Sequence, residues 1–339
     1  MAVLAIDIGG TKCAVALTDA SGDILTSEVA PTPPGGDAET LWQSLWSLIE
    51  TTVGAETVDG VGVGCGGPMA WPEGVVAPLN MPGWRDGFPV VARLRERFPG
   101  VPVRVHNDAI ALAAAEHWKG AGRGVDDMIG MVVSTGVGGG LILGGRLING
   151  GTGNAGHIGH VVVDPAGPPC GCGGNGCLEA IARGPALAAW AVDQGWVPGT
   201  PAAGPIDPEL SEREAAALYR ENAKATGRQL AADAAAGDQI AVAAMNRAGW
   251  ALGLAIASAT HLCDVDLVTV GGGLSQSGPL LFEPLDEALR LHARMGFSSR
   301  VRVVPALLGQ EAGLIGAAAL IVGGDRYWSP GNIPGSARD

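Results

Sequence analysis

One short segment gathers side chains that bind metals. Residues 156–179 read GHIGHVVVDPAGPPCGCGGNGCLE, with three cysteines in the pattern Cys-x-Cys-x4-Cys and a histidine upstream of them. Three thiolates and one imidazole form the closed tetrahedral donor set of structural zinc. Three cysteines cannot pair evenly, so a disulfide framework would leave one thiol over. The sequence therefore predicts a structural Zn²⁺ held by His160, Cys170, Cys172 and Cys177.

Three glycine-rich turns follow apolar strands and are candidates for binding phosphate. They are DIGGTK at 7–12, STGVGGG at 134–140 and GGG at 271–273. Glycines let backbone N–H groups approach phosphate oxygens, while Thr hydroxyls and one Lys add donors. None of them is a Walker A loop, and Gly136 leads into a further strand rather than the helix of a dinucleotide fingerprint. Each turn alone is equally well read as a tight hairpin without a ligand, but three together favour a nucleotide.

The Asn107-Asp108 pair ends the apolar run VPVRVHND. A carboxylate at the end of a strand, opening a helix, can serve as a general base that removes a proton from a substrate hydroxyl. Asn and Asp are also the preferred helix caps. Local sequence alone favours the cap, so the surrounding motifs must decide.

Composition limits the class of protein and its partners. The 339 residues are 47% hydrophobic and 16% charged, which indicates a soluble globular chain with a large core and two domains. A net charge of −13 argues against a nucleic-acid surface. No signal peptide and no apolar run of transmembrane length is evident, so we expect a cytoplasmic protein without a membrane partner. Cys13, Cys65 and Cys263 lie singly in apolar or glycine-rich strands and are expected to be inert.

Strand and helix patterns alternate along the chain, which is typical of the α/β class. Residues 1–10, 12–30 and 58–67 read as strands, and residues 38–54 have apolar side chains at helical spacing. A short strand at 101–108 then precedes an Ala/Leu-rich helix. These elements predict a twisted sheet with covering helices.

The strand, glycine turn, strand theme of the N-terminus restarts in residues 128–150. A domain boundary is therefore expected near the glycine-rich stretch 120–125. Residues 197–209 are rich in Pro and Gly and predict a surface loop, and residues 324–339 predict a loose tail.

The motifs occur in an order that resembles the ROK family of repressors, sugar kinases and uncharacterised proteins. The resemblance rests on DIGGTK, GCGGP, the ND pair, STGVGGG, GH with CGCGGNGCLE, and the late VGGG, from residue 4 to about 320. It implies an actin-like, hexokinase-type (ribonuclease H-like) α/β fold with two lobes around a cleft. The lobes would be 1–120 and 121–308, with a helix near 309–323 crossing back to the first. Repressor members carry a helix-turn-helix domain before DIGGTK, so the position of that motif at Asp7 favours the kinase branch.

The resemblance also implies an activity and a set of site residues. The activity is ATP-dependent phosphorylation of the 6-hydroxyl of glucose or a closely related sugar, with Mg²⁺ on the ATP phosphates and Asp108 as general base. Sugar contacts are expected at Gly67, Asn80, Asn107, Asp108, His157, His160 and Glu179. ATP contacts are expected at Gly9, Gly10, Thr11, Lys12, Thr135, Gly136, Gly272 and Gly273.

His157 departs from the family pattern. Relatives usually read E-x-G-H, with the Glu on the sugar and the His on zinc, whereas this chain reads His157-Ile158-Gly159-His160. An imidazole can donate, accept or carry charge, unlike a carboxylate. In one interpretation His157 binds the same glucose hydroxyl as the usual Glu does. In the other, it adapts the pocket around carbons 1 to 3 to another hexose or to an amino sugar. A cationic amine beside an imidazole is unfavourable, which favours a neutral sugar.

Other classes of function stay open on the sequence alone. A sugar-sensing regulator without turnover and a dinucleotide-dependent oxidoreductase are the alternatives, although Asp108 and the three turns speak against the first. Polyphosphate is a second possible donor, and a homodimer or homotetramer is the expected assembly. The sequence does not rank glucose against mannose, allose, N-acetylated or aminodeoxy sugars.

Overall fold

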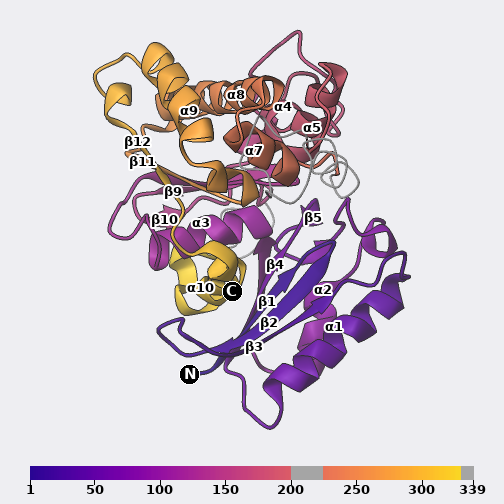
Figure 1. Ribbon diagram of the computed structural model, residues 1–339. Helices are drawn as coiled ribbons and strands as arrows, with labels where there is room; N and C mark the ends of the chain where they lie inside the picture. Colours follow the sequence, from indigo (N-terminus) through magenta and orange to yellow (C-terminus); the bar gives the residue numbers. More distant parts are fainter. Residues whose placement is uncertain (200–223, 330–339) are drawn as a thin grey trace, which may run out of the picture. The chain divides into compact units, whose positions relative to one another are not determined.

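A computed structural model describes residues 1–199 and 224–329 of the chain (Figure 1). The chain divides into two units by internal contacts. The first comprises Met1–Gly130, Gly139–Gly156 and Ala306–Asp339, and the second Met131–Gly138 and His157–Pro305. Residues 121–130 and 139–156, which the sequence places in the second lobe, therefore belong to the first unit. The glycines near 120 end a helix and are not the point where the chain changes unit.

A five-stranded mixed sheet forms the first unit. Its strands are β1 (Val3–Ile8), β2 (Lys12–Thr18), β3 (Ile24–Pro31), β4 (Gly60–Cys65) and β7 (Val103–Asn107), in the order β3-β2-β1-β4-β7. Strands β1, β4 and β7 are parallel, with Ile8 opposite Cys65 and Cys65 opposite Asn107. The carboxyl ends of these three strands therefore meet at one edge of the sheet, and the residues that follow them gather there.

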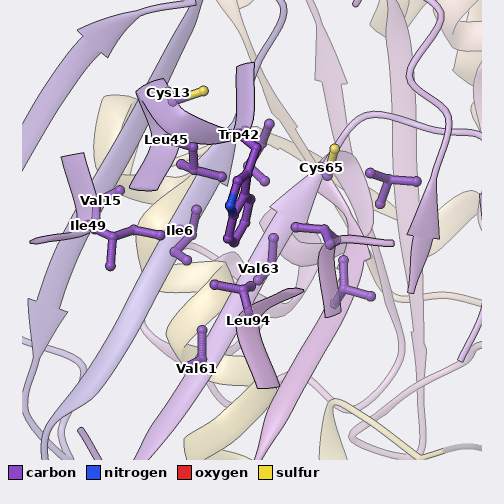
Figure 2. Packing of buried hydrophobic residues seen from close by; sticks show 14 of the residues in the cluster. Ile6, Cys13, Val15, Trp42, Leu45, Ile49, Val61, Val63, Cys65 and Leu94 are labelled. Atoms are coloured by element: carbon purple, nitrogen blue, oxygen red, sulfur yellow. The ribbon is translucent and has the colours of Figure 1, made fainter. Parts of the chain in front are cut away.

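Alternate residues of β1 pack on opposite faces of this sheet, as a period of two requires. Leu4 and Ile6 belong to the cluster that also holds Trp42 of α1 (Ala38–Val53) and Leu94 of α2 (Val90–Arg97) (Figure 2). Val3 and Ala5 pack instead with residues of α10 (Ala312–Val322). On that face a Cβ on Gly62 would overlap the carbonyl oxygen of Ala317, so α10 lies directly on β4.

Helix α3 (Asp108–Trp118) follows β7 directly, as the sequence predicts. Short elements complete this part of the unit. They are β5 (Met69–Ala70), β6 (Val75–Val76), and the 3₁₀ turns η1 (Pro82–Trp84), η5 (Gly309–Glu311) and η6 (Gly324–Arg326).

A second five-stranded sheet has the order β10-β9-β8-β11-β12. Its strands are β8 (Met128–Val133), β9 (Val137–Leu143), β10 (Arg146–Leu147), β11 (Leu267–Gly271) and β12 (Arg302–Pro305). The repeated theme of strand, glycine turn and strand is confirmed, because β8 and β9 flank the second turn as β1 and β2 flank the first.

The second unit is rich in helices. They are α4 (Leu178–Ala182), α5 (Gly184–Asp193), α7 (Gly227–Ala235), α8 (Gln239–Cys263) and α9 (Pro279–His292), with 3₁₀ turns η2 (Ile158–His160), η3 (Gly273–Ser277) and η4 (Ser298–Arg300). Among the described residues α8 alone is long and apolar enough to cross a membrane, a length that the sequence reading missed. Its most apolar window is 61% buried within the structure, as in the core helix of a globular protein. Cys263 ends this helix, half-buried, so its predicted place in a strand is wrong.

Two further sequence predictions concern the loop at 197–209 and the tail at 324–339. Residues 200–209 and 330–339 lie outside the described residues. Residues 324–329 are not a loose tail, because η6 is followed by Tyr327, which is 1% exposed. Its hydroxyl lies 2.8 Å from His117 Nδ1, so the ring is fixed by packing and by a hydrogen bond.

Candidate functional site

The first glycine turn is a hairpin between β1 and β2. The Gly9 N–H donates to the Lys12 carbonyl at 3.0 Å, and Thr11 and Lys12 are exposed. The Lys12 ammonium donates to Gln310 Oε1 at 3.2 Å. The turn therefore offers a hydroxyl, a cation and backbone groups to the solvent at the carboxyl end of β1.

Four of the predicted sugar contacts lie together beside this turn. A Cβ on Gly10 would stand 2.5 Å from Asn80 Nδ2, and one on Gly67 would stand 3.3 Å from Asn107 Nδ2. A Cβ on Gly66 would lie 3.9 Å from Asn80 Oδ1 and 4.0 Å from Asp108 Oδ2. The first unit thus brings Gly67, Asn80, Asn107 and Asp108 to the edge where β1, β4 and β7 end.

The two members of the ND pair have different surroundings. Asn107 is buried and is the N-cap of α3, since its Oδ1 accepts the Ala109 N–H at 3.0 Å. Asp108 is the first helical residue and is exposed, and its Oδ1 accepts the same N–H at 2.8 Å. The capping role therefore falls mainly to Asn107, and the Asp108 carboxylate remains accessible to a ligand.

Asp7 is a candidate functional residue that the sequence reading left out of the site. Burial, and next the negative charge of Asp108, raise the pKa of Asp7 from 3.8 to about 6, although Lys12 lowers it. Both acids lie near Gly64, since a Cβ there would stand 3.8 Å from Asp7 Oδ1 and from Asp108 Cα. A single acid in the apolar run LAIDIGG was the available signal.

Asp7→Asn should stabilise the protein at neutral pH. Between pH 4 and 6 the folded state binds more protons at Asp7 than the unfolded state, so the free energy of unfolding falls as pH rises. The loss amounts to at most about 3 kcal/mol at pH 7, and the asparagine variant should not show it. Urea unfolding at pH 4.5 and 7 measures the effect, with the exposed Asp193→Asn as control. Equal pH dependence in wild type and Asp7→Asn would contradict the shifted pKa.

The second glycine turn contacts the segment that follows the cysteines. The Val137 N–H donates to Glu179 Oε2 at 2.9 Å, and a Cβ on Gly136 would stand 2.9 Å from the same oxygen. Thr135 is exposed. Glu179, predicted as a sugar contact only, therefore also holds the second turn. Sequence reasoning missed this contact because 42 residues separate the hydrogen-bonded pair.

The third turn lies beside the second. Gly272 has φ +90°, and a Cβ there would overlap the backbone of Val133, so only glycine fits. A Cβ on Gly273 would stand 3.8 Å from Ser134 Oγ. The second unit thus assembles Thr135, Gly136, Gly272 and Gly273.

The predicted zinc ligands form one cluster. The ligand atoms of His160, Cys170, Cys172 and Cys177 all lie within 4.8 Å of one another. His160 Nδ1 is 3.7 Å from Cys170 Sγ, and Cys172 Sγ is 3.7 Å from Cys177 Sγ. A tetrahedron with Zn–S bonds near 2.3 Å has S···S edges of about 3.8 Å. The donor set and its spacing therefore fit one zinc ion.

Backbone hydrogen bonds hold the cysteine loop in shape. The Cys170 N–H donates to the Gly174 carbonyl at 2.7 Å, and the Leu178 N–H donates to the Val161 carbonyl at 2.9 Å. Hydrogen bonding, first from the Gly174 backbone N–H, lowers the pKa of the Cys172 thiol. A thiolate is the form that binds a metal, so the loop favours the ligand state at this cysteine.

His157 directly precedes the short turn η2, and His160 is its last residue. His157 is half-buried, and its ring stacks on that of His160 with centroids 6.2 Å apart and planes at 19°. His160 directs Nδ1 to the cysteine cluster, as the sequence predicts for the zinc ligand. His157 is thus held against a ligand residue without joining the cluster itself.

The chain is similar to known sugar kinases in sequence and in fold. The chain is 32% identical over 323 residues to a glucokinase of Thermotoga maritima, covering 94% of this chain and 96% of that protein. It is 35% identical to an N-acetylmannosamine kinase of Escherichia fergusonii, covering 95% and 99%. A ROK glucokinase of Streptomyces griseus, solved with glucose and AMPPNP, superposes with a TM-score of 0.75 at 32% identity, covering 94% and 99%.

The structural neighbours include ROK glucokinases and hexokinases, so the fold is the actin-like, two-lobed α/β fold. The family model described as ROK matches residues 3–323, nearly the whole chain. With the ordered motifs, the glycine turns and the Cys/His cluster all in place, the chain belongs to the ROK family.

Proposed function

We propose that the chain is an ATP-dependent hexose kinase that phosphorylates the 6-hydroxyl of glucose or a closely related sugar. The observation that carries the proposal is the exposed carboxylate of Asp108, at the sheet edge that also holds the first glycine turn. Because Asn107 caps the helix, Asp108 is available as a general base. The similarity to glucokinases supports the same activity.

In the proposed reaction Asp108 takes the proton from the sugar 6-hydroxyl as its oxygen attacks the γ-phosphorus of ATP. The bond from the γ-phosphorus to the bridging oxygen breaks, and ADP leaves. Phosphoryl transfer depends mainly on positioning and on neutralising charge. Thr11, Lys12 and the turn N–H groups would bind phosphates, as would Thr135 and Gly136, and Gly272 and Gly273 would bind the adenosine side. Mg²⁺, when bound to ATP, supplies further positive charge.

The sugar is held by two groups of residues in this proposal. Gly67, Asn80 and Asn107 lie beside Asp108 in the first unit. His157 and Glu179 belong to the second unit, and the zinc ligand Cys177 comes two residues before Glu179. A structural Zn²⁺ at the cluster would hold the segment around Glu179 in one conformation, because a loop with few buried apolar residues is not fixed by packing alone.

A coupled ADP-release assay over a hexose panel tests the function. With ATP, we expect turnover on glucose, mannose or a related neutral hexose, and none without sugar. A regulator would bind sugar without releasing ADP, and an oxidoreductase would bind a nicotinamide dinucleotide. Comparing sugar phosphorylation with ATP and with polyphosphate shows which of the two is the phosphate donor.

An N-acetylated hexose is the second candidate substrate. Several N-acetylmannosamine kinases are about as similar to this chain as the glucokinases are. The acetamido group is neutral, so it does not place a cation beside His157. N-acetylmannosamine therefore belongs in the panel next to glucose.

His157→Glu should change the order of preference among hexoses more than it changes the KM for ATP. One hydrogen bond to a buried hydroxyl contributes about 0.5–1.5 kcal/mol, so shifts on the order of tenfold in kcat/KM are expected, chiefly at carbons 1 to 3. Zinc content should not change, because His160 remains. If His157→Glu lost zinc and His160→Ala kept it, His157 would be the zinc ligand and His160 the sugar contact.

The compartment and the assembly belong to the same proposal. None of the six cysteines forms a disulfide, which agrees with a reducing cytoplasm. Leu262, Leu291 and Met295 near the ends of α8 and α9 are 86%, 53% and 58% exposed, and a second copy of the chain could cover them. We infer a cytoplasmic homodimer or homotetramer.

A further inference from the structure

A buried histidine directly precedes the ND pair. His106 is fully buried, and its Nδ1 accepts the backbone N–H of Asn107 at 2.9 Å. Its Nε2 lies 2.8 Å from Asn149 Oδ1. Because Nδ1 is an acceptor in the neutral ring, the proton is on Nε2, and the ring donates to Asn149. One imidazole thus joins the backbone of Asn107 to a side chain 43 residues away.

Asn149 is also hydrogen-bonded to the C-terminal part of the described chain. Its Nδ2 donates to the Ser329 carbonyl at 2.7 Å. The neighbouring Trp328 donates from Nε1 to the Val105 carbonyl at 3.1 Å. Trp328 and Ser329, termed the C-terminal clasp, are therefore hydrogen-bonded to β7 directly and through Asn149.

Aromatic rings also pack against His106 and against the C-terminal clasp. The centroid of the Trp71 ring lies 5.7 Å from that of the His106 ring and 5.7 Å from that of the Trp328 ring. Trp71 is 6% exposed, so the imidazole is shielded from water. In such surroundings a hydrogen bond is hard to replace, and losing one partner leaves a buried polar atom unsatisfied. All these residues belong to the first unit.

We propose that His106 is a positioning residue that fixes the backbone of Asn107, and thereby the direction of the Asp108 carboxylate, and that the C-terminal clasp holds His106 in place. This inference rests on the proposed function, since it assumes that Asp108 is the base. His106 is buried beneath the ND pair and acts through Asn107. Its effect should therefore fall mainly on kcat, with a smaller rise in the KM for sugar, because Asn107 is also a proposed sugar contact.

Two substitutions separate the two hydrogen bonds of the ring. The Oδ1 of an asparagine can take the place of Nδ1, whereas the amide of a glutamine reaches the place of Nε2. His106→Gln, which loses the bond to Asn107, should lower kcat about tenfold, because small misplacements of a reacting group are costly. His106→Asn keeps that bond and should lower kcat by only about threefold. The KM for sugar should stay within about twofold in both variants.

The role of the clasp is tested through Asn149. Asn149→Leu should lower kcat about as much as His106→Asn does, and the double variant should show no further loss, because both remove the same link. Tyr327→Phe is the matched control. Tyr327 directly precedes the clasp and is hydrogen-bonded at 2.8 Å to the buried His117 of α3. This bond does not lead to Asn107, so its loss should leave kcat at the wild-type level.

Amide hydrogen exchange gives a readout independent of turnover. Exchange at the Asn107 N–H should be faster in His106→Gln than in His106→Asn. Wild-type kcat in His106→Gln, with Asp108→Asn inactive, would overturn the inference and leave the proposed function standing. Absence of turnover of any hexose by the wild type would overturn the proposed function. Unchanged Asn107 exchange in His106→Gln would overturn the positioning link alone.

Discussion

Asp108→Asn should lower kcat by about a thousandfold or more while sugar affinity stays within about tenfold. Asparagine keeps a hydrogen-bonding group of the same size at the same place, but it cannot accept the proton from the sugar hydroxyl. Single-turnover kinetics and equilibrium sugar binding measure the two quantities separately. Near wild-type kcat would mean that Asp108 is only part of the helix start.

The local structure makes this test clean. Since Asn107 caps α3, removing the Asp108 charge should cost only about 0.5 kcal/mol of helix-dipole interaction. The melting temperature should therefore change little. Asp238→Asn is the matched control, because Asp238 caps α8 with its side chain on the Ala241 N–H at 2.8 Å. That variant should keep full activity.

Cys172→Ser should remove the bound zinc and lower both thermal stability and sugar affinity. Three ligands with one weakly binding hydroxyl do not close the tetrahedron, and the loop loses the free energy of metal binding. A fall in the melting temperature of about 5 °C or more is expected. Elemental analysis, calorimetry and sugar binding measure the three effects.

The same variant should also disturb the second glycine turn. Glu179 follows the last zinc ligand by two residues, and its carboxylate accepts the Val137 N–H. A loosened cysteine loop therefore releases that turn, and the KM for ATP should rise with the KM for sugar. Cys263→Ser is the control, since this half-buried thiol lies outside the cluster. Full activity in zinc-free wild-type protein would contradict a structural role for the metal.

Much of the local structure could be predicted from the sequence because it depends on neighbours in the chain. Glycines after apolar runs predicted the turns at Gly9 and Gly136, and the spacing of the cysteines predicted the cluster that the structure forms. The strand and helix around the ND pair were predicted from short-range patterns as well. The assignment of the cap to Asn107 was open, because either side chain can accept an N–H at a helix start.

Features that depend on distant residues could not be predicted. The raised pKa of Asp7 comes from burial and from the charge of Asp108, which begins α3 about 100 residues further along the chain. The contact of Glu179 with the second turn, and that of His106 with Asn149, each join segments about 40 residues apart. The point after Gly130 at which the chain changes unit also depends on residues distant in sequence, since a Cβ on Gly130 would stand 2.6 Å from Ala113 of α3.

The position of α10 on β4 has a consequence for the order of events during synthesis. The face of the first sheet that carries Val3, Ala5 and Gly62 leaves the ribosome before the helix that covers it, which begins only at Ala312. At typical elongation rates the intervening chain of roughly 300 residues takes on the order of half a minute to make. During that time the apolar face is exposed to other nascent chains and to chaperones. The first sheet therefore completes its tertiary structure only after α10 has been synthesised.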